Sequence, residues 1–180
     1  MGVLIGHASI SENGTINGSA GDQTGKEVCT RAWYAGWDFM AIHPDAAVRE
    51  KHAKAVEAGC ANDNIGYSQY GSDNRNTLNT QAKAVGYDLS KIKTKCNTDC
   101  SAFQNVCAVA SGSGATYGSN GWVTSNMKAN LQAAGYKIIT DPTYLASEEY
   151  CVRGAIYVKA SKHTVAGLTN GSKAAQTLQK

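Results

Sequence analysis

The order of the predicted elements most limits the folds open to this chain. Its last apolar runs, residues 155–159 and 163–168, have the length and composition of β-strands. The segments with helical spacing of apolar residues come before them. Helices first and antiparallel strands last is the order of the α+β class, so we predict an α+β fold.

Start and stop signals divide the helical part of the chain. Pro44 supplies a helix start and Gly59 ends that run, while Gly86 stops a shorter helix that begins at Thr77. A later helix is predicted over residues 125–134. The middle of the chain should therefore consist of several helices joined by loops.

The first forty or so residues are predicted as strand and loop. Residues 3–10 and 27–34 have strand character. Between them, Asn13-Gly14 and Asn17-Gly18 are turn signals.

Composition excludes several classes of function. The 180 residues are 42% hydrophobic, enough for one core, so we expect a single domain. A net charge of +3 is too small to argue for nucleic acid, and no apolar run is long enough to cross a bilayer. The N-terminus lacks the basic flank, long apolar core and cleavage site of a signal peptide. We therefore expect a soluble protein made without a leader, with no membrane insertion.

The six cysteines are expected to be reduced thiols, because a chain without a leader stays in a reducing compartment. Cys96, Cys100 and Cys107 are clustered in sequence. However, no Cys-x-x-Cys pair and no nearby histidine complete a tetrahedral zinc site. We expect no metal and no organic cofactor.

Cys100 is the candidate nucleophile. It falls in the first turn of a predicted helix that either Asn97 or Asp99 can cap. The partial positive charge of a helix N-terminus favours the thiolate, so we expect a lowered thiol pKa there.

His163 is the candidate base, because its strand can pack against the cysteine helix, and a cysteine nucleophile needs such a partner. The other three histidines are assigned to the opening strand (His7), a position before a proline (His43) and a helix face (His52). On these residues alone, a buried thiol and a strand-end histidine without catalytic roles remain an open alternative.

The surrounding motifs resemble those of the NlpC-type papain-like cell-wall peptidases, and phage endolysin catalytic domains in particular. Asp99-Cys100-Ser101 is preceded by Ile-Gly-Tyr-Ser at 65–68 and followed by Gly-Ala-Ile-Tyr at 154–157 and His-Thr-Val at 163–165. The resemblance covers about residues 44–170, and its specificity lies in the ordered spacing.

The resemblance implies a papain-like fold and assigns roles. Cys100 would be the nucleophile and His163 the base, and Tyr67 would donate a hydrogen bond near the oxyanion. Asp99 and Ser101 would contact substrate. Asp99 and Tyr67 also have plain structural alternatives, as a helix cap and a packing residue.

The position of the third catalytic residue differs from the family pattern. In the family, a His, Asn or Gln follows on the strand after the catalytic histidine. No histidine follows His163 in this chain. If Asn170-Gly171 forms a two-residue hairpin turn, Gln176 lies on the same face as His163, which makes it our orienting candidate. Asn170 is the alternative, although the turn would occupy it. Ala155 stands where the family has an acidic residue.

The resemblance divides the chain into three parts. Residues 1–43 would be a strand and loop extension packed on the catalytic core, and residues 44–171 the papain-like cysteine hydrolase core. Residues 172–180 would be a terminal strand or the start of a linker.

The implied function is cysteine-dependent hydrolysis of an amide bond in peptidoglycan, by a monomer made in the bacterial host cytoplasm that acts on the wall after release. The leading bond joins D-glutamate to the diamino acid of the stem peptide, since Asp99 could hold a free L-alanine amine. One alternative is an N-acetylmuramoyl-L-alanine amidase on the same fold. Others are a non-catalytic wall-binding or phage structural module and a Cys-His acyl transferase.

Overall fold

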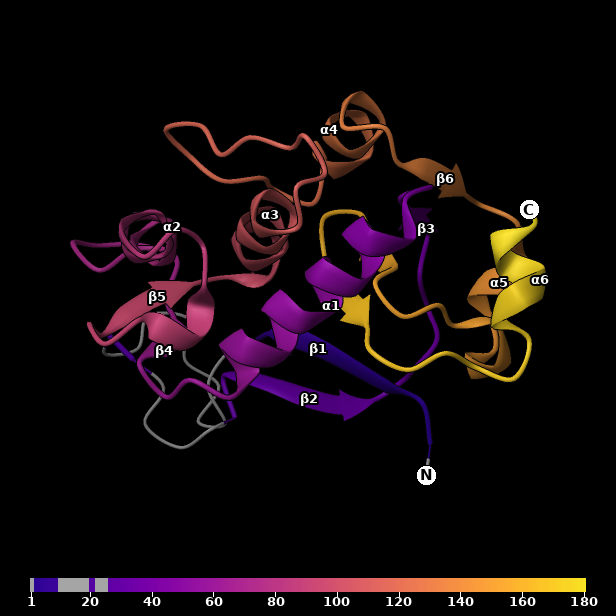
Figure 1. Ribbon diagram of the computed structural model, residues 1–180, viewed down its shortest axis with the longest axis horizontal. Helices are drawn as coiled ribbons and strands as arrows, with labels where there is room; N and C mark the ends of the chain where they lie inside the picture. The colour runs from indigo at the N-terminus through magenta and orange to yellow at the C-terminus, as the bar shows by residue number, and fades with distance from the viewer. Residues whose placement is uncertain (1, 10–19, 22–25) are drawn as a thin grey trace.

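The computed structural model describes residues 2–9, 20–21 and 26–180, and it confirms the α+β class (Figure 1). A six-stranded antiparallel sheet has the order β2-β1-β8-β7-β3-β6. Helices and a two-stranded sheet surround it. The turns predicted at residues 13–14 and 17–18 lie outside the described residues.

The strands of the large sheet come from both ends of the chain. In chain order they are β1 (Leu4–Ala8), β2 (Val28–Ala32), β3 (Phe39–Ile42), β6 (Lys137–Ile139), β7 (Ile156–Lys159) and β8 (His163–Gly167). The small sheet pairs β4 (Ile65–Tyr67) in parallel with β5 (Cys96–Thr98). In the large sheet β1 pairs with β8, so the opening strand lies beside the last one.

Four helices lie where the sequence signals predict them, and two short helices after residue 140 were not predicted. The helices are α1 (Ala46–Cys60), α2 (Thr77–Ala84), α3 (Cys100–Ala110), α4 (Met127–Ala133), α5 (Pro142–Leu145) and α6 (Ala174–Leu178), with 3₁₀ turns η1 (Leu89–Lys91) and η2 (Glu148–Tyr150). Asp45 caps α1 and Asp99 caps α3, each accepting a hydrogen bond from a backbone N–H of the first turn.

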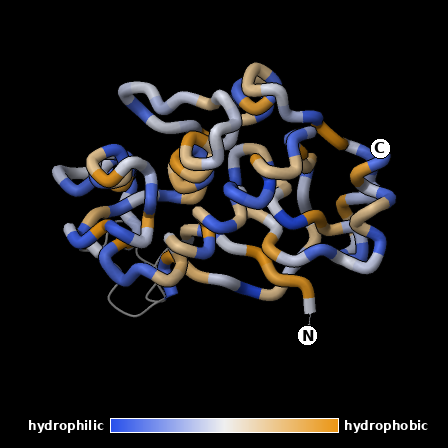
Figure 2. Tube along the Cα trace, viewed as in Figure 1, coloured by the Kyte–Doolittle hydropathy of each residue, from blue (hydrophilic) through white to orange (hydrophobic). Residues whose placement is uncertain are grey.

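Helices α1 and α3 cover one face of the sheet. Helix α1 contacts β1, β2 and β8, and α3 contacts β1, β8 and α1. The approach at β1 needs glycine, because a Cβ on Gly6 would lie 2.4 Å from Cγ1 of Val56. Figure 2 shows apolar residues gathered along α3 and the N-terminal strand. This packing fixes the start of α3 against the strand that carries His163.

The N-terminal segment is part of the sheet. Residues 1–43 supply β1, β2 and β3, and β3 lies between β7 and β6. A boundary at residues 43 and 44 therefore does not separate two structural units. The sequence prediction missed β3 because its apolar residues follow an aromatic stretch without alternation.

The predicted terminal strand is wrong, because residues 174–178 form helix α6, which packs against η2. Strand β8 pairs with β7 on one side and with β1 on the other, so neither edge of β8 is open to a strand from the tail. Asn170 and Gly171 bond elsewhere: Asn170 Oδ1 accepts from the Arg153 N–H, and the Gly171 N–H donates to the Cys151 carbonyl. No helix in the described ranges is long and apolar enough to span a membrane.

Candidate active site

Cys100 is the first residue of α3, and its side chain is buried with 8% of the residue exposed. The backbone N–H groups of Ser101 and Thr164 lie close enough to its sulfur to lower the thiol pKa. Thr164 directly follows His163 in β8. The thiol therefore lies beside the strand end that carries the candidate base.

Burial dominates the ionisation of Cys100. Loss of water raises the pKa of its thiol to about 11, and the Asp99 carboxylate adds to that shift. The backbone N–H groups and the Arg75 guanidinium act in the opposite direction but do not offset it. The expectation that the helix terminus holds the sulfur as an anion is therefore wrong for the resting site.

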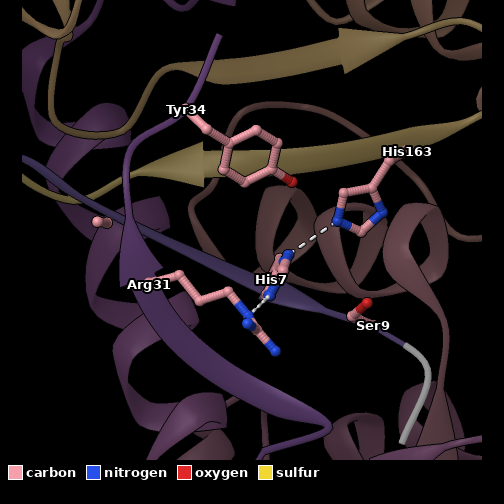
Figure 3. Close-up of a pocket in the computed structure, with 6 residues that line it drawn as sticks. His7, Ser9, Arg31, Tyr34 and His163 are labelled. Carbon is pink, nitrogen blue, oxygen red and sulfur yellow. Dashed lines mark hydrogen bonds between the residues drawn. The ribbon is translucent and has the colours of Figure 1, made fainter. Parts of the chain in front are cut away.

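His163 is held by a second histidine that the sequence prediction left out of the site. His7 Nδ1 lies 2.8 Å from His163 Nε2, and Arg31 Nε donates to His7 Nε2 at 2.9 Å (Figure 3). His7 lies on β1 and Arg31 on β2, so three neighbouring strands carry this row.

Arg31 determines which nitrogen of each ring carries a proton. A guanidinium can only donate, so His7 Nε2 accepts and the proton of the neutral ring lies on Nδ1. His7 Nδ1–H then donates to His163 Nε2. The neutral His163 ring consequently carries its own proton on Nδ1, the nitrogen that His7 does not occupy.

Both rings are neutral at pH 7. Burial lowers the pKa of His163 to about 4, and the Arg31 charge contributes. Burial lowers the pKa of His7 to about 3, with His163 and Arg31 contributing next. The resting site therefore holds a thiol and two neutral imidazoles.

Trp37 stacks on the His163 ring, with centroids 6.4 Å apart and planes 30° from parallel. The indole N–H of Trp37 donates to the Tyr34 carbonyl at 2.6 Å. Stacking on one side and the hydrogen bond to His7 on another fix the orientation of His163.

Both carboxylate oxygens of Asp99 accept hydrogen bonds from other groups of the protein. Its Oδ2 accepts from Arg75 Nε at 2.7 Å, and Oδ1 accepts from the Ala102 N–H at 3.0 Å. Arg75 also donates to Ser101 Oγ at 3.1 Å. Asp99 and Ser101 are both buried, so they stabilise the start of α3 and do not present free polar groups to a substrate.

Tyr67 lies at the end of β4 and is buried. Burial raises the pKa of its hydroxyl, and the charges of Cys100 and Asp99 raise it further. The hydroxyl is therefore protonated and close to the thiol. It accepts a hydrogen bond from Gln69 at 3.3 Å, which leaves its own proton available to donate.

Gln176 does not reach this site, since it lies exposed in α6 rather than on a strand beside β8. Asn170 accepts a hydrogen bond from the Arg153 N–H, away from His163. His7 is the residue whose side chain hydrogen-bonds the His163 ring. The contact between His7 and His163 follows from the pairing of β1 with β8. The spacing of these residues along the chain does not predict it.

A cavity of about 640 Å³ opens over the histidine pair. Among the described residues, the cavity is lined by His7, Ser9, Arg31, Ala32, Tyr34 and His163. The Tyr34 hydroxyl points toward the two rings in Figure 3. Burial raises the pKa of that hydroxyl, the Arg31 charge acts in the opposite direction, and Cys100 is close enough to add to the rise.

Among the described residues, no group of three or more His, Cys, Asp or Glu side chains is arranged to hold a metal ion. In comparisons with known proteins, a family model described as an endolysin-like domain matches residues 5–174. Neither the curated proteins nor the solved structures give a match.

Proposed function

The chain belongs to the endolysin-like domain family, and from that premise we propose that it is a cysteine hydrolase that cuts an amide bond in peptidoglycan stem peptides. Membership indicates lysis of the cell wall and a peptidoglycan substrate. The proposal adds the chemistry: Cys100 is the nucleophile and His163 its acid and base.

The observation that carries this proposal is the row from Arg31 through His7 to His163, together with the backbone N–H of Thr164, the next residue of β8, which acts on the buried Cys100 sulfur. Burying polar rings costs free energy unless their hydrogen bonds are satisfied. An inert thiol needs no such row. A nucleophile needs a base, and the base needs a partner that orients it.

The arrangement also supports a papain-like catalytic layout. Cys100 begins a helix, His163 begins the strand packed on that helix, and His7 lies on the adjacent strand. In this proposal the third member comes from the N-terminal strand β1, where the sequence analysis placed it in the C-terminal tail.

Proton transfer occurs at Nδ1 of His163, so that nitrogen must first lose its resting proton. Each imidazole exchanges to the tautomer that carries its proton on Nε2, so that His163 Nε2–H donates to His7 Nδ1. Arg31 must then release His7 Nε2, because that nitrogen now carries a proton and two N–H donors cannot face each other. His163 then takes the thiol proton as sulfur bonds to the carbonyl carbon, and gives it to the leaving nitrogen as the C–N bond breaks. Water deprotonated by the same ring hydrolyses the thioester.

The developing oxyanion is stabilised by N–H groups at the start of α3 and by the Tyr67 hydroxyl. Donors held in place before the reaction are effective because they need no reorganisation. Tyr67 is protonated and close to the sulfur, which suits this role.

For the bond that is cut, we propose the link between D-glutamate and the diamino acid. Asp99 is paired with Arg75, so its carboxylate does not serve to hold a free L-alanine amine. The support comes instead from Arg31, a cation at the cavity. A γ-linked D-glutamate has a free α-carboxyl group near its scissile carbonyl, whereas the muramoyl-L-alanine bond of the amidase alternative has none.

The test is digestion of purified Gram-positive walls, followed by mass spectrometry of the muropeptides. We expect the native protein to clear the walls and to create new free D-glutamyl termini. Cys100→Ala should abolish both effects, and Cys29→Ser should change neither. Clearing by Cys100→Ala would exclude thiol catalysis and favour the wall-binding module. Release of intact stem peptides would identify an amidase.

A further inference from the structure

Arg31 is exposed on β2, at the cavity over the histidine pair. Its Nε donates to His7, and within the described part of the chain this is the only hydrogen bond of its guanidinium. No carboxylate among those residues pairs with it. In Figure 3 its terminal nitrogens point away from His7. Two strong donors are therefore available where Arg31 lines the cavity.

Two other arginines are paired with carboxylates. Arg75 pairs with Asp99, and Arg153 pairs with Glu50 and Glu57. Arg49 directs Nη1 to the carbonyl oxygens of His43 and Pro44. Arg31 differs because its Nη groups, which have no partner among the described residues, lie at the cavity that contains the proposed base.

We propose that this cavity is a carboxylate subsite, in which the Nη groups of Arg31 bind a free carboxylate of the stem peptide next to the bond that is cut. The inference rests on the proposed function and names the recognition element of that site. A guanidinium presents paired N–H groups that match the two oxygens of a carboxylate, and such pairs are among the stronger polar contacts.

The same contact connects substrate binding to the base. In the resting site Arg31 holds His7 Nε2 as an acceptor and so keeps a proton on Nδ1 of His163. A bound carboxylate draws the guanidinium toward itself and offsets the guanidinium charge. That charge is, after burial, a cause of the lowered His163 pKa. His7 can then exchange its tautomer, and His163 Nδ1 becomes free to accept the thiol proton.

The experiment compares three synthetic muropeptides on the full chain. One carries both free carboxylates, one has the D-glutamate α-carboxyl amidated, and one has the diamino-acid carboxyl amidated. We expect one amidation to lower kcat/KM of the native protein on the order of 10- to 100-fold, and that probe identifies the carboxylate bound.

The variants separate recognition from structure. Arg31→Met should cleave the free and amidated peptides at equal, low rates, and Arg31→Lys should retain part of the preference. Lys128→Met removes an exposed charge outside the cavity and should keep the full preference. If native protein cuts all three peptides equally, the subsite is overturned. The native and Arg31→Lys comparison still decides the question if Arg31→Met does not fold.

A second readout uses alkylation of Cys100 by iodoacetamide, which is neutral. Arg31→Met should react several-fold faster than the native protein at pH 7, although it hydrolyses peptide more slowly. A purely structural role for Arg31 predicts losses in both. Equal cleavage of the three peptides by the native protein, with Cys100 still essential, would overturn only the subsite. Cleavage that survives Cys100→Ala would overturn the proposed function itself.

Discussion

His7 and His163 share a 2.8 Å hydrogen bond although 156 positions separate them in the sequence. The bond forms because β1 lies beside β8 in the sheet. It connects the proposed base to a residue of the opening strand, and the site depends on both ends of the described fold.

Replacing His7 should impair catalysis far more than replacing Gln176. His7→Ala removes the group that orients the His163 ring, and we expect kcat to fall on the order of 10²- to 10⁴-fold, as for other orienting residues. Gln176→Ala changes an exposed residue of α6 and should leave kcat unchanged. Kinetics on a soluble muropeptide measure both. Equal rates for the two variants would remove His7 from the site.

The pH profile of kcat/KM should have its acidic limb well below the usual histidine value. Burial lowers the pKa of His163 from 6.5 to about 4, so the ring remains neutral and able to accept a proton down to that region. The profile measured between pH 3.5 and 8 reports the free enzyme. A limb near pH 6.5 would contradict a buried base.

Stability should decrease as pH falls from 6.5 toward 4. His52 is buried between α1 and α3, its Nε2 lies 2.8 Å from Gln104 Oε1, and burial lowers its pKa to about 4. The unfolded chain binds this proton below pH 6.5 and the folded chain does not, so protonation favours unfolding. One such group contributes a slope of about 1.4 kcal/mol per pH unit.

Urea unfolding of His52→Gln measures that contribution. The slope of the unfolding free energy between pH 4.5 and 6 should be smaller than in the native protein by about 1.4 kcal/mol per unit. His7 and His163 also have lowered pKa values, so they account for the pH dependence of the unfolding free energy that remains in His52→Gln. An unchanged slope would show that His52 is not the titrating group.

Removing Arg75 should destabilise the start of α3. Arg75→Met leaves the buried Asp99 carboxylate without its partner, which typically costs about 3–5 kcal/mol. Thermal and urea unfolding give the loss. The variant should also alkylate more slowly at Cys100, because the Arg75 charge lowers that thiol pKa.

Asp99→Asn separates a structural role from substrate contact. We expect it to lower stability while treating free and acetylated L-alanine amines alike, because the carboxylate is bound to Arg75. Kinetics on the two peptides provide the measurement. A loss confined to the free-amine substrate would restore Asp99 as a recognition residue.

Local signals in the sequence predicted the helices well. Pro44 precedes α1, and Asp99, one of the two expected caps, caps α3, while α1 runs one residue past Gly59, its predicted end. Such signals act within one helical turn, so a single sequence contains them. The short strands β4 and β5 were missed, because each has three residues and depends on pairing with the other.

The candidate site was predictable only in part. Cys100 and His163 could be proposed from a helix start and a strand start, whereas His7 could not. Its role depends on which strand lies next to β8, and that choice is made by packing between distant segments. Gln176 was selected on the assumption that neighbouring strands follow one another in sequence, which β1 contradicts.

The adjacency of β1 and β8 also has a consequence for biosynthesis. A ribosome delivers His7 long before His163, so a nascent chain holds one half of the imidazole pair without the other. The proposed nucleophile, translated in between, has no partner until β8 is released and docks against β1. Translation order alone therefore keeps the proposed site unassembled until β8 has been synthesised.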